Sequence, residues 1–69
     1  MLVLSRKVDE RIIITIPPSD ETQVVTVMMV GTETSGAARL GIDAPKSIYV
    51  DREEVHEAIM RDGGKRKRY

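Results

Sequence analysis

The chain has 69 residues, no cysteine and a single histidine. A monomer of this length buries only ~60% of the surface that its unfolded chain exposes. Small scaffolds usually gain the missing stability from disulfides, a metal or oligomerisation, and this composition removes the first two. We therefore expect an oligomer.

The formal net charge is zero, but the charge is unevenly distributed. Residues 1–64 carry seven Lys or Arg against eleven Asp or Glu, and residues 65–68 add four further cations. Bulk charge therefore does not indicate nucleic-acid binding, and any RNA site must be a local cluster of cations. The only aromatic residues are Tyr49 and Tyr69, so the stacking platforms of many RNA-binding folds are missing.

Two features of the chain predict a cytoplasmic protein. The apolar residues 1–4 precede the basic pair Arg6-Lys7, which reverses the order that a signal peptide needs. No apolar run approaches the ~20 residues of a membrane-spanning helix. We expect no membrane association.

Apolar residues alternate with a period of two over most of the chain, and β-branched residues dominate, which predicts short strands. The predicted strands cover residues 2–7, 11–16, 24–30, 37–42 and 47–50. Pro17-Pro18 must end the second strand, because proline donates no hydrogen bond to a ladder. The glycines at 31 and 36 bracket a hairpin loop between the third and fourth strands.

After the fifth strand the period changes to that of a helix. Asp51 and Glu54 have the spacing of a capping box, which predicts Asp51 as the N-cap residue. Val55 and Ile59 form one narrow apolar stripe, and the glycines at 63 and 64 end the helix. So short a helix must dock on another element to hold.

The predicted fold class is mostly β, with five short strands and a C-terminal helix. An open sheet of short strands leaves unpaired backbone groups at its edges. A symmetric dimer that exchanges strands would cover these edges and enlarge the core.

Two segments carry a family resemblance. Residues 1–8 read MLVLSRKV, and residues 39–55 read RLGIDAPKSIYVDREEV. Both resemble the hallmark regions of the bacterial carbon storage regulator family (CsrA/RsmA), and the similarity covers residues 1–16 and 24–60.

The resemblance implies an intertwined homodimer with a barrel-like or sandwich-like core, in which the first strand of one subunit lies beside the fifth strand of the other. It implies a regulator that binds GGA motifs in hairpin loops of mRNA 5′ leaders. Binding would compete with the ribosome or alter mRNA stability. Residues 1–62 would form the RNA-binding domain, and residues 63–69 a basic, disordered tail.

The expected partners are mRNA, antagonist small RNAs and an antagonist protein, without DNA, metal or cofactor. The resemblance assigns RNA binding to Leu4, Ser5, Arg6, Lys7, Arg39, Ala44, Pro45, Ile48, Val50, Asp51 and Arg52. Backbone groups of an exposed strand edge can read single-stranded bases, and the arginines and lysine can neutralise phosphates.

The chain departs from the family pattern at five places, one of which is a hairpin between the third and fourth strands that is one residue longer. Residues 16–23 replace a much tighter turn, Lys7 stands where Arg is usual, Asp51 where His is common, and Asp9 where Gly is usual. Asp9 would strain its turn if its φ were positive. Asp51 would weaken phosphate binding unless it caps the helix.

Other interpretations of these residues stay open. Arg6 and Lys7 could protect a strand edge, Arg52 could pair with a neighbouring carboxylate, and Ile48 and Val50 could be core or dimer contacts that read RNA only through their backbones. His56 between acidic residues suggests a solvated helix face rather than a metal site.

No nucleophile–base pair or phosphate loop is present in the sequence, so we expect no enzymatic activity. The alternative function is a strand-swapped dimeric protein-interaction module that has lost specific RNA binding. Lys7, Asp51 and the acidic body favour it.

Overall fold

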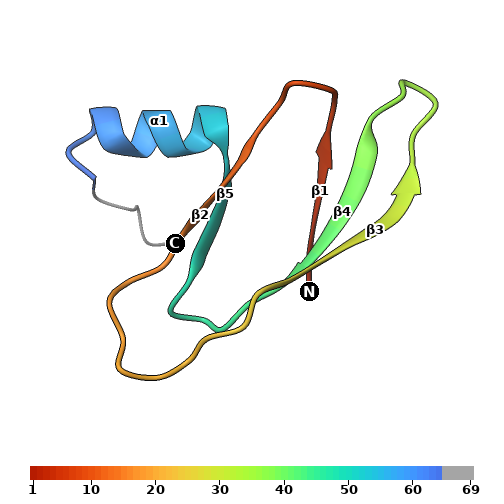
Figure 1. Cartoon of the computed structure of the whole chain (residues 1–69). Coiled ribbons are helices and arrows are strands. Elements are labelled where there is room, and N and C mark those ends of the chain that lie inside the picture. The colour runs from red at the N-terminus through yellow and green to blue at the C-terminus, as the bar shows by residue number, and fades with distance from the viewer. Residues whose placement is uncertain (65–69) are drawn as a thin grey trace.

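The computed structural model describes residues 1–64 (Figure 1). Five strands form two antiparallel sheets, and one helix follows the last strand, which confirms the mostly β fold class. The elements are β1 (Leu2–Arg6), β2 (Ile12–Thr15), β3 (Thr26–Thr32), β4 (Ala38–Asp43), β5 (Tyr49–Arg52) and α1 (Glu53–Arg61). Residues 65–69 of the predicted basic tail lie outside the described residues.

The larger sheet has the strand order β1-β4-β3. Its register places Leu2 opposite Ile42 and Leu4 opposite Leu40. Because side chains alternate between the faces of a strand, these four residues share one face. Ile42 is buried, which marks this face as the inner one.

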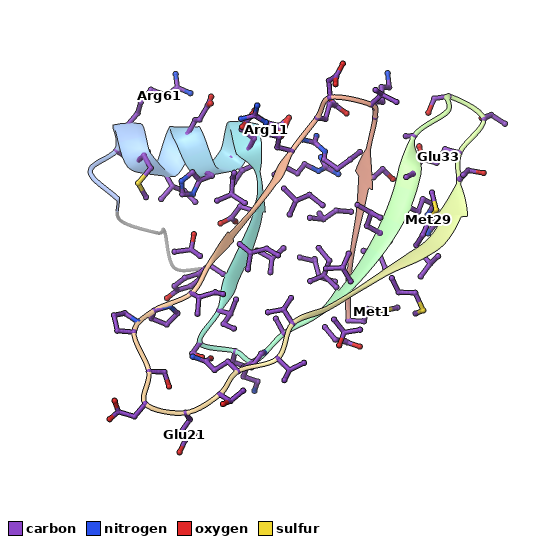
Figure 2. All side chains as sticks on the ribbon, in the orientation of Figure 1. Met1, Arg11, Glu21, Met29, Glu33 and Arg61 are labelled. Carbon is purple, nitrogen blue, oxygen red and sulfur yellow. The ribbon has the colours of Figure 1, made fainter. Side chains whose placement is uncertain are left out.

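The smaller sheet pairs β2 with β5, with Ile14 opposite Val50. Before β5 the chain turns at Pro45, whose carbonyl accepts a hydrogen bond from the Ile48 amide at 3.0 Å. Ile48 is buried, as the core interpretation of this residue predicts. Side chains fill the space between the two sheets (Figure 2).

The enclosed core is small. Within residues 1–64, the buried apolar residues are Ala37, Ile42 and Ile48. Met29 on β3 keeps 62% of its surface exposed and Val27 keeps 52%. A single copy of the chain therefore leaves much of its apolar surface open to water, and extended exposed apolar surfaces mark interaction sites.

Several strand limits differ from those that the sequence predicts. β3 begins at Thr26 rather than at residue 24, and it runs through Gly31 to Thr32. β5 covers Tyr49–Arg52 rather than residues 47–50, because the turn from Pro45 to Ile48 comes first and the pairing with β2 then continues to Arg52.

The predicted capping role of Asp51 is wrong. Asp51 lies in β5 opposite Ile13, and the N-cap position falls on Arg52, whose side chain makes no capping hydrogen bond. The amide of Glu53, the first helical residue, donates instead to the carbonyl of Arg11 at 3.1 Å. Arg11, the residue directly before β2, therefore supplies an acceptor at the helix start, where an N-cap side chain usually provides one.

The end of α1 agrees with the prediction. Gly63 and Gly64 have positive φ angles of 88° and 77°, and their amides donate to the carbonyls of Met60 and Ile59 at 3.1 and 2.9 Å. Glycine tolerates this left-handed conformation, which satisfies free carbonyls at a helix end. No helix within residues 1–64 is long and apolar enough to cross a membrane.

The turn between β1 and β2 places Asp9 at a φ of 69°, the one positive value at a non-glycine residue within residues 1–64. The amide of Glu10 donates to the carbonyl of Lys7 at 3.1 Å, which closes the turn. The carboxylate of Glu10 accepts from the amide of Lys7 at 2.7 Å. The positive φ that the predicted strain at Asp9 requires is therefore present.

We expect Asp9→Gly to stabilise the fold by about 1 kcal/mol, because glycine has no Cβ and adopts positive φ without steric cost. Urea unfolding followed by circular dichroism measures the change. Asp20→Gly is the matched control, since Asp20 lies in an exposed loop and has no positive φ. Equal effects of the two substitutions would contradict the assignment of strain to Asp9.

Candidate nucleic-acid interface

Within residues 1–64, four strands have one strand neighbour each, namely β1, β2, β3 and β5. Two of them carry predicted site residues: β1 pairs with β4 alone and β5 pairs with β2 alone. Both strands therefore lie at the edge of a sheet. The backbone of an edge strand can pair with another strand or hydrogen-bond to the edges of unstacked bases.

The strands β1 and β5 run in the same direction, one in each sheet (Figure 1). We call the space between them, which side chains fill, the gap. Their beginnings meet around a hollow of about 210 Å³ that Leu2 and Val50 both line. Their far ends meet where Arg6, at the end of β1, contacts Glu54 just beyond β5. The predicted site residues therefore separate into two groups, one at each end of this gap.

The first group surrounds the hollow at the start of β1 and β5. Four predicted site residues line it, namely Ala44, Pro45, Ile48 and Val50. Ala44 and Val50 are half-buried and Pro45 is exposed. The amino group of Met1 lies 3.6 Å from a carboxylate oxygen of Asp43 at the same hollow, which anchors the beginning of β1 to the end of β4.

The second group centres on Arg6, whose side chain is only 9% exposed. Its Nη1 and Nη2 lie 2.9 and 3.1 Å from the two carboxylate oxygens of Glu54. Nη1 also donates to the carbonyl of Arg11 at 3.1 Å, and Nε to the carbonyl of Ser5 at 3.0 Å. Four of the five N–H groups of Arg6 are thus engaged.

This contact changes the acid–base properties of both partners. The hydrogen bond from Arg6 lowers the pKa of Glu54 below its ordinary value of 4.5, because it favours the charged carboxylate. The same contact raises the pKa of Arg6. Both groups are therefore charged at neutral pH, and a phosphate could reach Arg6 only by competing with Glu54.

Ser5 is also engaged within the chain. It lies opposite Arg39 in the β1–β4 pair, and its hydroxyl donates to the carboxylate of Glu33 in the β3–β4 hairpin. Glu33 and Glu54 are the two residues that sequence reasoning missed at this site. Glu54 stands inside the second family-like segment, but its spacing from Asp51 indicated a capping box instead.

The exposed cations of the site are Lys7, Arg39 and Arg52, and none of them forms an ion pair with another residue of the described chain. Lys7 directly follows β1, and Arg52 ends β5 one residue before α1. These two cations are therefore at the same end of the gap as Arg6. Asp51 is half-buried in β5 beside them.

Within residues 1–64, no group of three His, Cys, Asp or Glu side chains is placed to hold a metal ion. His56 is a half-buried residue of α1. What the arrangement offers is a pair of edge strands with exposed cations at both ends, Lys7 and Arg52 at one and Lys46 beside the hollow at the other.

The fold and the site define the class: a small, mostly β protein whose edge strands β1 and β5 have exposed cations beside them. Comparison with known sequences gives the family. The profile of the CsrA global regulator protein family matches residues 1–61. The chain belongs to this family.

Three relatives illustrate the similarity, each named translational regulator CsrA. The protein of Rhodopirellula baltica is 40% identical over 62 residues, which cover 90% of this chain and 77% of the relative. That of Lachnospira eligens is 40% identical over 60 residues, covering 87% and 71%. That of Thermosipho melanesiensis is 38% identical over 65 residues, covering 94% and 76%. No solved structure gives a significant match.

We expect Glu54→Gln to destabilise the fold at neutral pH, because Arg6 loses its charged partner. The pKa of Glu54 is lowered in the folded state. The pair with Arg6 therefore stabilises the fold fully above the ordinary pKa of Glu54, and this stabilisation is lost as the pH falls through the lowered pKa. The difference in unfolding free energy between wild type and variant should therefore shrink below about pH 4.5.

Glu57→Gln is the control for this measurement. Glu57 lies one turn further along α1 and is exposed, and its carboxylate forms no ion pair within the described residues. Urea unfolding of the three proteins between pH 7 and pH 3 measures the effect. A pH-independent difference for Glu54→Gln would contradict an ionic contribution from this pair.

Proposed function

We propose that this chain is a homodimeric regulator of translation that binds GGA motifs in hairpin loops of mRNA 5′ leaders. Binding there competes with the ribosome or alters the stability of the mRNA. Membership of a global regulator family supports the proposal, as do the names of relatives that are about 40% identical over most of the chain.

The observation that carries the proposal is the pair of open edges on β1 and β5, with Lys7 and Arg52 exposed at their common end. Backbone groups at regular spacing can hydrogen-bond to the edges of unpaired bases, and the cations can hold the phosphates that connect them. No aromatic platform is required for this mode of recognition.

The exposed apolar surface and the same open edges support a homodimer. If β1 of one copy pairs with β5 of the other, two mixed sheets of five strands result. This pairing covers the middle of both edges, and RNA then contacts the backbone beyond it, at the ends where Lys7 and Arg52 lie. The exposed side chains of β1 and β5 then gain a partner surface. The two RNA sites of such a dimer lie where the exchanged strands meet.

Among the cations, Arg52 is the strongest candidate for a direct phosphate or base contact. It is exposed and forms no ion pair within residues 1–64, whereas Arg6 is held by Glu54. We assign Arg6 to the interface through its position at the end of β1. Lys7 supplies a second, point-like charge.

The acidic body of residues 1–64 limits non-specific binding. Few phosphate contacts are available, so affinity should depend only weakly on salt. The slope of log K against log salt concentration is about −0.7 for each phosphate neutralised on single-stranded RNA. Antagonist small RNAs with the same loop motif would compete for the same edges, and so would a protein that covers them. The cytoplasm, where mRNA meets ribosomes, is the compartment that this function requires.

A titration with hairpin RNAs tests the proposal. A loop that contains GGA should bind at least about tenfold more tightly than the same loop with CCA, because each misread base costs ~1–3 kcal/mol. Equal affinities would instead favour a dimeric protein-interaction module that does not read RNA sequence. Fluorescence anisotropy in moderate salt measures both constants.

Arg52→Ala should weaken GGA binding roughly tenfold or more, since a charged hydrogen bond contributes ~1.5–3 kcal/mol. Arg61→Ala is the matched control, because Arg61 is an exposed arginine in the last turn of α1, the helix that follows Arg52. The same anisotropy titration applies to both variants. An equal loss for the two would show that only overall charge matters.

The dimer is tested by mass. Light scattering at low micromolar concentration should give about twice the chain mass of 7.7 kDa. Replacing the exposed inner-face residue Leu2 by Asp should shift the population toward the monomer, since the carboxylate would be buried between exchanged strands. A wild-type protein that stays monomeric would leave the two-subunit RNA site unbuilt.

A further inference from the structure

The connection between β2 and β3, residues 16–25, is mostly exposed, but it contacts the connection between β4 and β5. Gln23 in this connection accepts a hydrogen bond from the hydroxyl of Ser47 at 3.0 Å. Ser47 belongs to the connection between β4 and β5, which also contains Ala44 and Pro45 of the candidate interface. Figure 1 shows the two connections passing close to each other at the same end of the molecule.

The two connections enclose a hollow of about 530 Å³, within the range of roughly 300–1,000 Å³ that ligand sites occupy. Its walls combine proline rings with short polar side chains. The lining residues are Pro17, Pro18, Ser19, Glu21, Thr22, Gln23, Val24, Pro45 and Ser47. Flat apolar rings beside hydroxyl and amide groups match the chemistry of a nucleobase, which has apolar faces and polar edges.

This hollow adjoins the candidate interface at Pro45. Pro45 lines the larger hollow and also the smaller one around Ala44, Ile48 and Val50. An RNA loop that occupies the interface at Pro45 can therefore place a neighbouring nucleotide next to Gln23 and Ser47.

The charges of the hollow favour a base over a phosphate. Among residues 1–64, no lysine or arginine lines it, whereas Glu21 does, and the Glu21 side chain extends outward at the tip of the loop (Figure 2). A phosphate in the hollow would be repelled by this carboxylate. A neutral base avoids that cost and can use the Gln23 amide, whose orientation the Ser47 hydroxyl fixes.

We propose that residues 17–24, together with Pro45 and Ser47, form an additional subsite for one unpaired nucleobase that flanks the core motif. Gln23 hydrogen-bonds to the edge of this base, and the proline rings pack against its face. The inference rests on the proposed RNA binding and extends the recognised sequence beyond GGA on one side.

The test uses three hairpin RNAs whose loops contain GGA alone, GGA with three additional uridines on the 5′ side, or GGA with three additional uridines on the 3′ side. One of the two enlarged loops should bind the wild-type chain about 5- to 30-fold more tightly than the minimal loop, as expected for one additional stacked base. Gln23→Ala and Ser47→Ala should each lose this gain and keep the affinity for the minimal loop.

Ser35→Ala is the matched control, because Ser35 is an exposed serine in the β3–β4 hairpin and should keep the full gain. A 4-thiouridine at the first flanking position should cross-link to a peptide containing residues 17–24, which mass spectrometry identifies. Thermal unfolding of each variant checks that the fold is retained.

The outcomes separate the two proposals. If the wild-type chain prefers GGA to CCA but neither enlarged loop binds more tightly, the subsite is refuted and the proposed function stands. A gain that persists in both Gln23→Ala and Ser47→Ala also refutes it, since the flanking nucleotides are then read elsewhere. If GGA and CCA bind equally, the proposed function fails and the subsite fails with it.

Discussion

The guanidinium of Arg6 joins elements that lie far apart in the sequence. It reaches Glu54 in the first turn of α1 and the carbonyl of Arg11 at the start of β2. The same Arg11 carbonyl accepts the first helical amide, that of Glu53. The end of β1 and the beginning of α1 are thereby fixed to each other, and with them the exposed Arg52 that stands between β5 and the helix.

The second constraint is the lack of enclosed core. Each chain folds into a sheet of three strands and a sheet of two strands, which approach one another only along part of their length. Their outer strands β1 and β5 keep open edges, and large apolar side chains of β1 and β3 stay in water. A second copy can cover the apolar surface that a single copy leaves exposed. The ends of β1 and β5 beside this surface can accept an RNA loop.

Residues 1–64 carry more carboxylates than cations, and Lys7, Arg39 and Arg52 form no ion pairs within them. Both facts bear on where RNA can bind. Under the proposed function, the attraction of residues 1–64 to RNA is local, because carboxylates outnumber cations in this part of the chain. Specificity in such a protein comes from backbone groups and shape rather than from bulk charge. The β2–β3 connection extends this shape, since its contact with Ser47 places a polar and proline-lined wall beside the candidate interface.

The sequence by itself determined the number and type of the elements, since the period-two pattern, the glycine pair after α1 and the prolines after β2 act through neighbouring residues. It also determined the family, through residues 1–8 and 39–55. It did not determine the start of α1, because the acceptor for the first helical amide comes from Arg11, directly before β2, rather than from Asp51. Likewise, the partners of Arg6, Ser5 and Gln23 lie 48, 28 and 24 residues away in the chain. Only tertiary structure could decide them, because contacts at such separations depend on how the sheets are placed and leave no periodic signal in the sequence.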